Sequence, residues 1–187
     1  MHRNPLLSLI TTYKAQHPEE METIQRLTTF IQNNTHCFNR TLTVGHITGS
    51  AWLTHPDGSK VLLTHHRKLN KWLQLGGHAD GQTDILSVAQ REAVEESGLS
   101  NIVPLSHHIF DIDIHPIPAN SREAAHDHYD IRFALQAIGS DHVRVSEESH
   151  DLSWVPITAL HEITSEISIL RMRRKWLKSI SNYQSPS

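Results

Sequence analysis

Cysteine is nearly absent from the chain, since Cys37 is the only one among 187 residues. A single thiol cannot form an internal disulfide, which excludes a disulfide-stabilised fold and favours a reducing cytoplasm. No apolar run in the sequence approaches the roughly 20 residues that a membrane-spanning helix needs. The first residues lack a small-residue cleavage site, so no signal peptide is expected. The sequence therefore predicts a cytoplasmic protein that is not inserted in a membrane.

A strong net charge is also lacking. The 17 Lys and Arg residues nearly balance the 20 Asp and Glu residues, which gives −3 at pH 7 with neutral histidine. Bulk attraction to nucleic acid or to an anionic membrane is therefore not expected. Internal repeats and low-complexity segments are missing as well. A chain of this length, with 37% hydrophobic and 20% charged residues, fits one folded domain with its own core.

Basic residues are scarce in the middle of the chain, where Arg91 is the only Lys or Arg between residues 72 and 121. Three acids in this span, Glu92, Glu95 and Glu96, are spaced so that one face of a helix would carry all of them. Each like-charged pair on an exposed helix costs about 0.2–0.5 kcal/mol. A divalent cation, which prefers clustered carboxylate oxygens, would offset that repulsion. A solvated acidic helix face is the alternative interpretation.

Residues 85–97 are predicted to form this helix because they contain neither Pro nor Gly. Asp84 or Thr83 can accept a hydrogen bond from the first turn, and Gly98 suits a left-handed residue at the end. An apolar stripe beside the glutamates consists of Leu86, Ala89 and Ala93. The three acids should therefore lie at the edge of the buried side of the helix.

Residues 77–99 resemble the signature box of the Nudix hydrolases. That box reads Gly, five residues, Glu, seven residues, Arg-Glu, an aliphatic residue, any residue, Glu-Glu, any residue, Gly and an aliphatic residue. The residues that fall in register are Gly77, Arg91, Glu92, Ala93, Glu95, Glu96, Gly98 and Leu99. One position departs from the pattern, because Thr83 stands where the box has its first Glu.

The resemblance implies an α+β fold, a Nudix-like three-layer α/β/α sandwich with a mixed β-sheet. We expect an N-terminal helical extension over residues 1–38, a Nudix-like hydrolase domain over 39–182 and a flexible tail over 183–187. Within the extension, helices are predicted over 5–16 and 18–33, and they should pack on the domain or on a second subunit in a homodimer. The apolar stripe of the second helix consists of Met21, Ile24, Leu27 and Ile31.

The activity that this resemblance implies is hydrolysis of a pyrophosphate bond in a nucleoside diphosphate linked to another group, with Mg²⁺ or Mn²⁺. The implied metal ligands are Glu92, Glu95, Glu96 and the carbonyl of Gly76. Arg91 would orient one of the glutamates through a charge-assisted hydrogen bond. A further acid is expected from the loop that holds Glu147 and Glu148. The general base is left open among these carboxylates.

Other functions fit parts of the pattern. The departure at Thr83 keeps open a catalytically weak ligand-binding or regulatory domain on the same fold. An isopentenyl-diphosphate isomerase shares the fold but uses a cysteine deep in its site, whereas Cys37 precedes the first core strand. Removal of a nucleic-acid cap would rely on the basic last helix, and the net charge argues against it. The expected partner is therefore a small nucleotide-type molecule, and neither nucleic acid nor a membrane.

Histidine is abundant, with 16 residues in the chain. Residues 108–114 and 127–135 alternate between apolar and polar side chains, which predicts two neighbouring antiparallel strands. Pairing them gathers six polar residues on one face: Asp111, Asp113, His115, His128, Asp130 and Arg132. This face is either a solvated sheet surface or a substrate wall or second metal site. We expect His78 and at least one of His126 and His128 to contact phosphate or a metal, with Arg132 as a further substrate contact.

The remaining elements are predicted from shorter patterns. A hairpin is expected from residues 41–54 and 60–64, short strands from 72–75 and 154–156, and a last helix over 165–180. The buried face of that helix should hold Ile169, Met172, Trp176 and Ile180. Its basic residues, interpreted as a solvated face, are Arg171, Arg173, Arg174, Lys175 and Lys178. Candidates for stacking a base are Trp52, Trp72, Tyr129 and Trp154.

Overall fold

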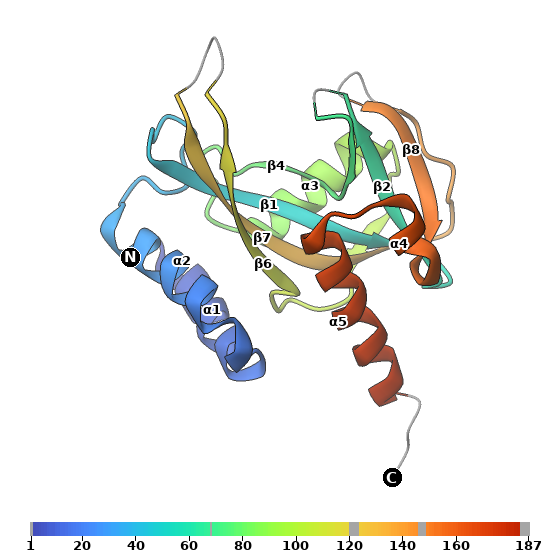
Figure 1. Cartoon of the computed structure of the whole chain (residues 1–187), viewed down its shortest axis with the longest axis horizontal. Helices are drawn as coiled ribbons and strands as arrows, with labels where there is room; N and C mark the ends of the chain where they lie inside the picture. Colours follow the sequence, from blue (N-terminus) through green and yellow to red (C-terminus); the bar gives the residue numbers. More distant parts are fainter. Residues whose placement is uncertain (1, 68, 120–123, 146–148, 184–187) are drawn as a thin grey trace.

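The computed structural model describes residues 2–67, 69–119, 124–145 and 149–183. Its strands are β1 (Gly45–Thr54), β2 (Lys60–His66), β3 (Lys71–Leu73), β4 (Leu75–His78), β5 (Ile102–Pro104), β6 (Asp111–Ile117), β7 (His126–Ala137) and β8 (Ser149–Pro156). Its α-helices are α1 (Asn4–Gln16), α2 (Met21–Asn33), α3 (Ile85–Ser97), α4 (Leu160–Ile163) and α5 (Ile167–Tyr183). Figure 1 shows one mixed sheet with α3 on one face and α5 on the other. This arrangement confirms the expected α+β sandwich with N-terminal helices.

Strand β1 lies at the centre of the sheet. It pairs in parallel with β7 and antiparallel with β4, while β7 pairs with β5 and β6, and β2 pairs with β3 and β8. The expected hairpin of β1 and β2 is present only near its turn, where Thr54 pairs with Val61, because β1 directs its hydrogen bonds to β7 and β4. The strand predicted over 72–75 is instead parts of two strands, β3 and β4, which pair with different neighbours.

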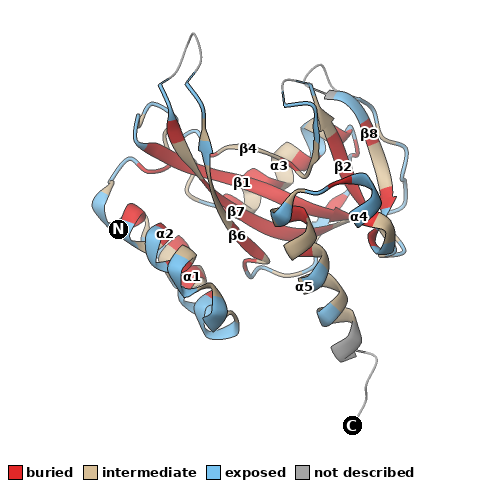
Figure 2. Cartoon of the chain, viewed as in Figure 1, coloured by how far each residue is buried: buried red, intermediate tan, exposed pale blue. Residues whose placement is uncertain are grey.

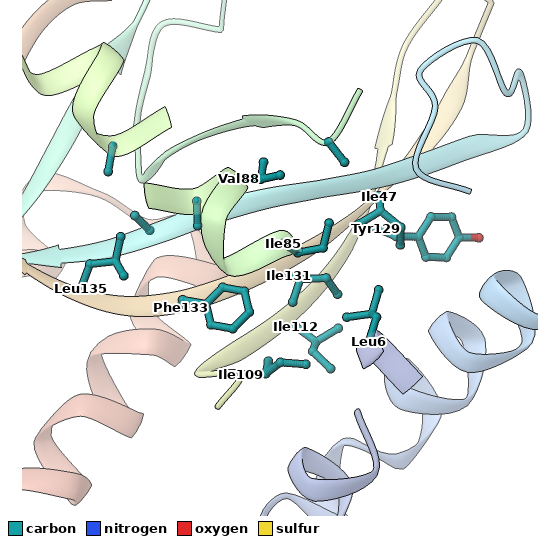
Figure 3. Close-up of a cluster of buried hydrophobic side chains, with 14 of the residues drawn as sticks. Leu6, Ile47, Ile85, Val88, Ile109, Ile112, Tyr129, Ile131, Phe133 and Leu135 are labelled. Atoms are coloured by element: carbon teal, nitrogen blue, oxygen red, sulfur yellow. The ribbon is translucent and has the colours of Figure 1, made fainter. Parts of the chain in front are cut away.

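Both faces of the central strands are covered. All residues of β1 are buried, and Figure 2 shows β1 and β7 buried along most of their length. On the α3 side, Ile47 and Ile131 of the sheet pack with Ile85 and Val88 of α3 (Figure 3). Leu6 of α1 belongs to the same cluster of buried side chains. None of the helices in the described residues combines the length and apolar character needed to cross a membrane.

The N-terminal helices pack on the domain, one of the two expected partners. The buried side chains of α2 are Ile24, Leu27, Phe30 and Ile31. Phe30 stacks on Tyr129 of β7, with ring centroids 3.8 Å apart. Met21 does not belong to the buried stripe, since it is 38% exposed at the first position of the helix. Residues 4–33 therefore share the hydrophobic core of the sheet.

Helix α5 covers the opposite face of the sheet. Ile169 and Met172 are buried in one cluster with Trp52 of β1, whereas Trp176 and Ile180 are only partly buried. Trp52 is 0% exposed, which removes it from the candidates for stacking a base. The predicted buried face of the helix is therefore confirmed in its first half.

Arg171 and Lys175 of α5 reach the sheet, which corrects the expectation that they belong to a solvated face. Arg171 Nη2 lies 2.7 Å from Asp111 Oδ2, and Lys175 Nζ lies 2.6 Å from Asp111 Oδ1. Asp111 also accepts a hydrogen bond of 3.2 Å from Arg132. Because Asp111 is 0% and Arg132 1% exposed, this end of the polar face is an internal ion-pair network. It is neither a solvated surface nor an open wall for substrate.

Strands β6 and β7 pair antiparallel as predicted, and their register sets Asp111 opposite Arg132 and Asp113 opposite Asp130. Arg132 Nε donates to Asp130 Oδ2 over 2.7 Å. Asp130 in turn accepts hydrogen bonds from the hydroxyls of Thr48 and Ser50 on β1, so β1, β6, β7 and α5 are joined through polar side chains. The charge of Arg132, which was expected to contact substrate, is therefore balanced inside the protein.

The cations around the two β6 aspartates outweigh the effect of burial on their pKa values. Burial by itself would raise the pKa of Asp111, but the hydrogen bond from Arg171 and the charges of Arg132, Arg171 and Lys175 hold that pKa below its usual range. Asp113 is also buried, and its pKa is lowered by the hydrogen bond with His115 and by the charge of Arg132. Such carboxyls stabilise the fold above their unfolded pKa of about 4, and the stabilisation is lost as the pH falls through the folded pKa.

We expect Asp111→Ala to lower the free energy of unfolding by about 3–5 kcal/mol, because it leaves buried cations without their partner. Urea unfolding at pH 7, followed by circular dichroism, measures this cost. The matched control is Asp141→Ala, which removes an exposed partner of His55 and should cost much less, because exposed ion pairs contribute little to stability. The difference between wild type and Asp111→Asn should shrink as the pH is lowered from about 4 toward the folded pKa. An equal cost for Asp111→Ala and Asp141→Ala would contradict the network.

Candidate metal and substrate site

Helix α3 begins and ends where the sequence predicts. Asp84, rather than Thr83, caps its start, because Asp84 Oδ1 accepts a hydrogen bond of 3.3 Å from the backbone N–H of Ser87. Gly98 ends the helix in the left-handed conformation, with φ of 71°. A residue with a side chain would be strained at that backbone angle. The position and length of the helix are therefore set by residues adjacent to it in the sequence.

Helix α3 lies very close to strand β1. Its buried side chains are Ile85, Val88, Ala89, Ala93 and Ser97, so the predicted stripe is confirmed at both alanines. Gly49 of β1 faces this helix. A Cβ atom at Gly49 would lie 2.9 Å from Val88 Cγ1 and 3.1 Å from the carbonyl oxygen of Ile85. The missing side chain thus allows the backbones of α3 and β1 to approach.

Two of the three box glutamates reach the glycines of β4. The backbone N–H of Gly76 donates a hydrogen bond of 2.9 Å to Glu96 Oε1. Glu92 lies against Gly77, where an added Cβ atom would be 2.4 Å from Glu92 Oε2. The Glu92 side chain is only 17% exposed, whereas that of Glu95 is 62% exposed. The glutamates therefore divide into two that are held against β4 and one that is directed to solvent.

Arg91 connects this glutamate cluster to the end of β4. Its Nη2 atom donates to Glu92 Oε1 over 2.7 Å and to the carbonyl oxygen of His78 over 3.0 Å. Its Nη1 atom donates to the side chain of Gln82 over 2.9 Å. Its Nε atom lies 4.0 Å from Glu95 Oε1. One guanidinium thus holds the helix, the strand and the loop between them, as its planar set of donors allows.

These donors have the chemistry of a site for a hard divalent cation. Mg²⁺ and Mn²⁺ prefer oxygen ligands, and the carboxylates of Glu92 and Glu96 are held against the adjacent residues Gly77 and Gly76 of β4. The absence of a Cβ atom at Gly77 leaves the space in which the Glu92 carboxylate lies. The residues present therefore fit such an ion. Glu147 and Glu148, the expected sources of a further acid, lie outside the described residues.

A group of histidines lies on the face of the sheet opposite α3. Nitrogen atoms of His46, His78 and His128 all lie within 4.8 Å of one another. The ring of His126 lies close by, with its centroid 4.8 Å from that of His46. Burial and the neighbouring imidazoles, among them His46, His78 and His115, lower the pKa of His128 to about 2. The structure thus brings together the three histidines predicted as site residues, and it adds His46.

His46 is the residue that sequence reasoning missed. His46 is followed two and four positions later by the polar residues Thr48 and Ser50, an alternation that was a signal for a polar face. The sequence does not show which strand lies beside β1. His46 lies opposite His128 only because β1 pairs in parallel with β7.

The other candidates for ligand contact have partners within the chain. Trp72 stacks on His65, with centroids 5.0 Å apart, and the indole N–H of Trp154 donates to the carbonyl oxygen of Asp141. Tyr129 borders a hollow of about 400 Å³ on the α2 side, whose lining contains none of the box residues. That hollow is therefore not the place of the metal chemistry.

Cys37 does not have the character of a catalytic nucleophile. Its side chain is 0% exposed, and burial raises the pKa of its thiol to about 11. The thiol therefore stays protonated at neutral pH, whereas the thiolate is the nucleophilic form. This observation removes the basis for an isomerase that depends on a cysteine.

Comparisons with known proteins identify the architecture. Residues 46–175 match the family model described as NUDIX domain. The chain resembles an Ap4A hydrolase of C. elegans in a binary complex, with a TM-score of 0.58 and 16% identity over 73% of this chain and 98% of that one. It also resembles a MutT protein of Methanosarcina mazei, with a TM-score of 0.57 and 18% identity over 77% and 99%. These likenesses establish the fold. No curated protein matches the chain.

The two glycines of β4 should respond differently to an added methyl group. At Gly76 a Cβ atom would lie 2.1 Å from Ser50 Oγ and 2.8 Å from the carbonyl oxygen of Gly49, so β1 and β4 would have to separate. We expect Gly76→Ala to cost about 1–3 kcal/mol of stability. At Gly77 the clash is with the end of the Glu92 side chain, which can rotate away, so Gly77→Ala should cost less.

Urea unfolding of both variants measures this difference. A crystal structure of Gly77→Ala should show the Glu92 carboxylate displaced from β4. Equal destabilisation by the two substitutions, or an unmoved Glu92, would contradict the packing described here.

Proposed function

The chain belongs to the Nudix family, and we propose that it is a divalent-metal-dependent hydrolase that cleaves a pyrophosphate bond in a nucleoside diphosphate linked to another group. The observation that carries the proposal is the placement of Glu92 and Glu96 of the box helix against Gly77 and Gly76 of β4. This arrangement holds hard oxygen donors from the end of the family signature against the glycines at its start. The signature alone supports the class of reaction, and the geometry supports its location.

A cation is needed because the substrate and the site have the same sign of charge. The residues that would hold Mg²⁺ or Mn²⁺ are Glu92, Glu95, Glu96 and the carbonyl of Gly76. When bound, such an ion supplies positive charge for the phosphate oxygens and lowers the pKa of water. Without it, the glutamates would repel a diphosphate.

The chain's own residues position these carboxylates. Arg91 fixes Glu92 by a charge-assisted hydrogen bond and ties the same guanidinium to the carbonyl of His78, so Glu92 and β4 keep their relative places. The N–H of Gly76 holds Glu96 Oε1 in a similar way. Glu95 is the most exposed of the three, and its carboxylate has the most freedom to accept a proton from water. The general base stays open among the three glutamates and Glu147 or Glu148.

The proposed substrate is a small nucleotide-type molecule. We infer a cytoplasmic location from the near absence of cysteine, and a homodimer stays a prediction. A panel of nucleoside diphosphate derivatives, assayed for release of phosphate-containing products with Mg²⁺, Mn²⁺ or neither, identifies the substrate. Cleavage that does not depend on a divalent ion would contradict the proposal.

We expect Glu96→Gln to lower the rate of pyrophosphate cleavage by about 10²–10³-fold, as for loss of one charge-stabilising group. Glutamine keeps an amide oxygen in place of Oε1, so the hydrogen bond from Gly76 can remain and the fold should be unchanged. Steady-state rates at saturating Mg²⁺, with thermal unfolding as a test of folding, measure this. The matched control is Glu22→Gln on α2, an exposed residue outside the box. Near-normal turnover by folded Glu96→Gln would overturn the metal-site assignment.

Thr83→Glu separates the hydrolase from a catalytically weak binding or regulatory domain, the alternative that the departure from the family pattern raises. Thr83 is partly exposed and immediately precedes the helix cap, so a longer side chain has access to solvent there. We expect the substitution to be tolerated and to raise activity or metal affinity modestly. Kinetics over a range of Mn²⁺ concentrations measure both quantities. A collapse of activity would show that Thr83 has a role of its own.

A further inference from the structure

The histidine group of the sheet comes from three strands, and only His78 also lies within the box. His46 comes from β1, His78 from the end of β4, and His128 from β7. Parallel pairing sets His46 opposite His128, and antiparallel pairing of β4 with β1 sets His78 opposite Thr48, two residues from His46. Three strands that are far apart in the sequence thus each place one imidazole on the face of the sheet opposite α3.

The distances within this group suit one bound ion. The ring centroids of His46 and His128 are 4.8 Å apart, those of His46 and His78 are 5.0 Å apart, and those of His78 and His128 are 5.1 Å apart. One nitrogen from each ring falls within 4.8 Å of the other two. Ligand nitrogens around a tetrahedral zinc ion are about 3.3 Å apart, given Zn–N bonds of about 2.0–2.1 Å. Small rotations of the rings would therefore bring the three nitrogen atoms to the separation that a bound zinc ion requires.

We propose that His46, His78 and His128 bind a divalent transition-metal ion of the Zn²⁺ type, in a second metal site on the sheet face opposite α3. Imidazole nitrogens favour zinc and similar ions, whereas the glutamate oxygens of the box favour Mg²⁺ or Mn²⁺, so the two sites select different metals. The three ligands leave one position of a tetrahedral site for His126 or a water molecule.

Burial of the imidazoles argues that they do more than fill space. His46 is 2% exposed and His126 is 9% exposed. The Nε2 atoms of His126 and His128 are buried without a hydrogen-bond partner among the residues that the structure describes. Buried polar atoms are rarely left in this state, and each such atom in a native structure requires an explanation. A metal ion in the middle of the group supplies one.

Hydrogen bonds around the group resemble those that orient metal-binding histidines. His126 Nδ1 lies 2.8 Å from the carbonyl oxygen of Ala124, which fixes the proton on Nδ1 and leaves Nε2 as the atom with a lone pair. His115, whose ring centroid is 5.6 Å from that of His128, contacts Asp113 through Nδ1 over 3.0 Å. The lone pair on Nε2 thus makes His126 available as the fourth ligand beside the three proposed ones.

Contact of the group with phosphate is the competing interpretation. A phosphate site would require positively charged groups beside the imidazoles, but the cation on the same face of β7, Arg132, is paired with Asp130 and Asp111. A neutral imidazole is the form that binds a metal ion.

Zinc binding to the full chain tests the proposal without reference to its hydrolytic activity. The protein is stripped with EDTA, dialysed, and titrated with ZnCl₂ in an isothermal calorimeter in the presence of excess Mg²⁺, which occupies the glutamate site. One Zn²⁺ per chain is expected. Replacement with Co²⁺ should give the visible absorption of low-coordinate cobalt with imidazole ligands.

Removal of one ligand should weaken zinc binding by more than about 100-fold, the upper end of what loss of an outer hydrogen-bond partner costs. The variants are His128→Ala and, because loss of the whole ring can disturb folding, the more conservative His78→Gln; both positions are half-buried. Circular dichroism confirms that each is folded. The matched control is His107→Ala, which removes an exposed histidine outside the group.

The variant Glu96→Gln tests the zinc site independently of the proposed hydrolytic activity. It should leave the zinc stoichiometry and affinity unchanged even though it removes a ligand of the other site. Absence of zinc binding by the wild-type chain, or equal binding by wild type, His128→Ala and His78→Gln, would overturn the second site. A third outcome would overturn it in favour of a phosphate site. In that outcome the metal-free chain binds inorganic pyrophosphate but no zinc, and both histidine variants lose the binding of pyrophosphate.

Discussion

The close approach of α3 to β1 and β4 is the constraint on which the glutamate site depends. Gly49 has no side chain to hold the helix away from the sheet, and Gly77 leaves the space that the Glu92 carboxylate occupies. Once the helix lies at this distance, Glu92 and Glu96 meet the strand, while Glu95 is directed to solvent. Arg91 then joins strand and helix by hydrogen bonds. The arrangement of the acids is thus a consequence of backbone packing, which tolerates little added volume.

The opposite face of the sheet satisfies a different requirement, the balance of buried charge. Asp111 is surrounded by Arg132 of β7 and by Arg171 and Lys175 of α5, so the last helix is tied to the sheet by ion pairs as well as by apolar contacts. A buried charge without a partner is strongly unfavourable, which makes these contacts interdependent. Toward the other end of the same strands the polar residues are histidines, which can be buried in the neutral form. One sheet face therefore holds two polar environments, one with paired charges and one with clustered imidazoles.

Particular residues show how far the sequence could be interpreted. The box helix, its left-handed end at Gly98 and the alternation that places the polar residues of β6 and β7 on one face follow from local patterns, and all are confirmed. The choice of Asp84 over Thr83 as the cap, and the exposure of Glu95, depend on atomic positions that a pattern does not contain. Arg171 and Lys175 were expected in solvent because the residues that pair with them lie about sixty positions earlier in the chain. His46 was missed because its partner strand is distant in sequence and parallel to it.

By itself, the sequence determined the elements whose formation depends on near neighbours: the helix of the box with three carboxylates on one side, its ends, and the alternation of the β6 and β7 strands. Helix capping and side-chain periodicity act over a few residues, so they can be predicted without knowledge of the tertiary structure. Only the tertiary structure decided which polar groups lose water and which partners they then acquire. Those choices depend on strand order and on burial, which join Asp111 to α5 and His46 to His78 and His128.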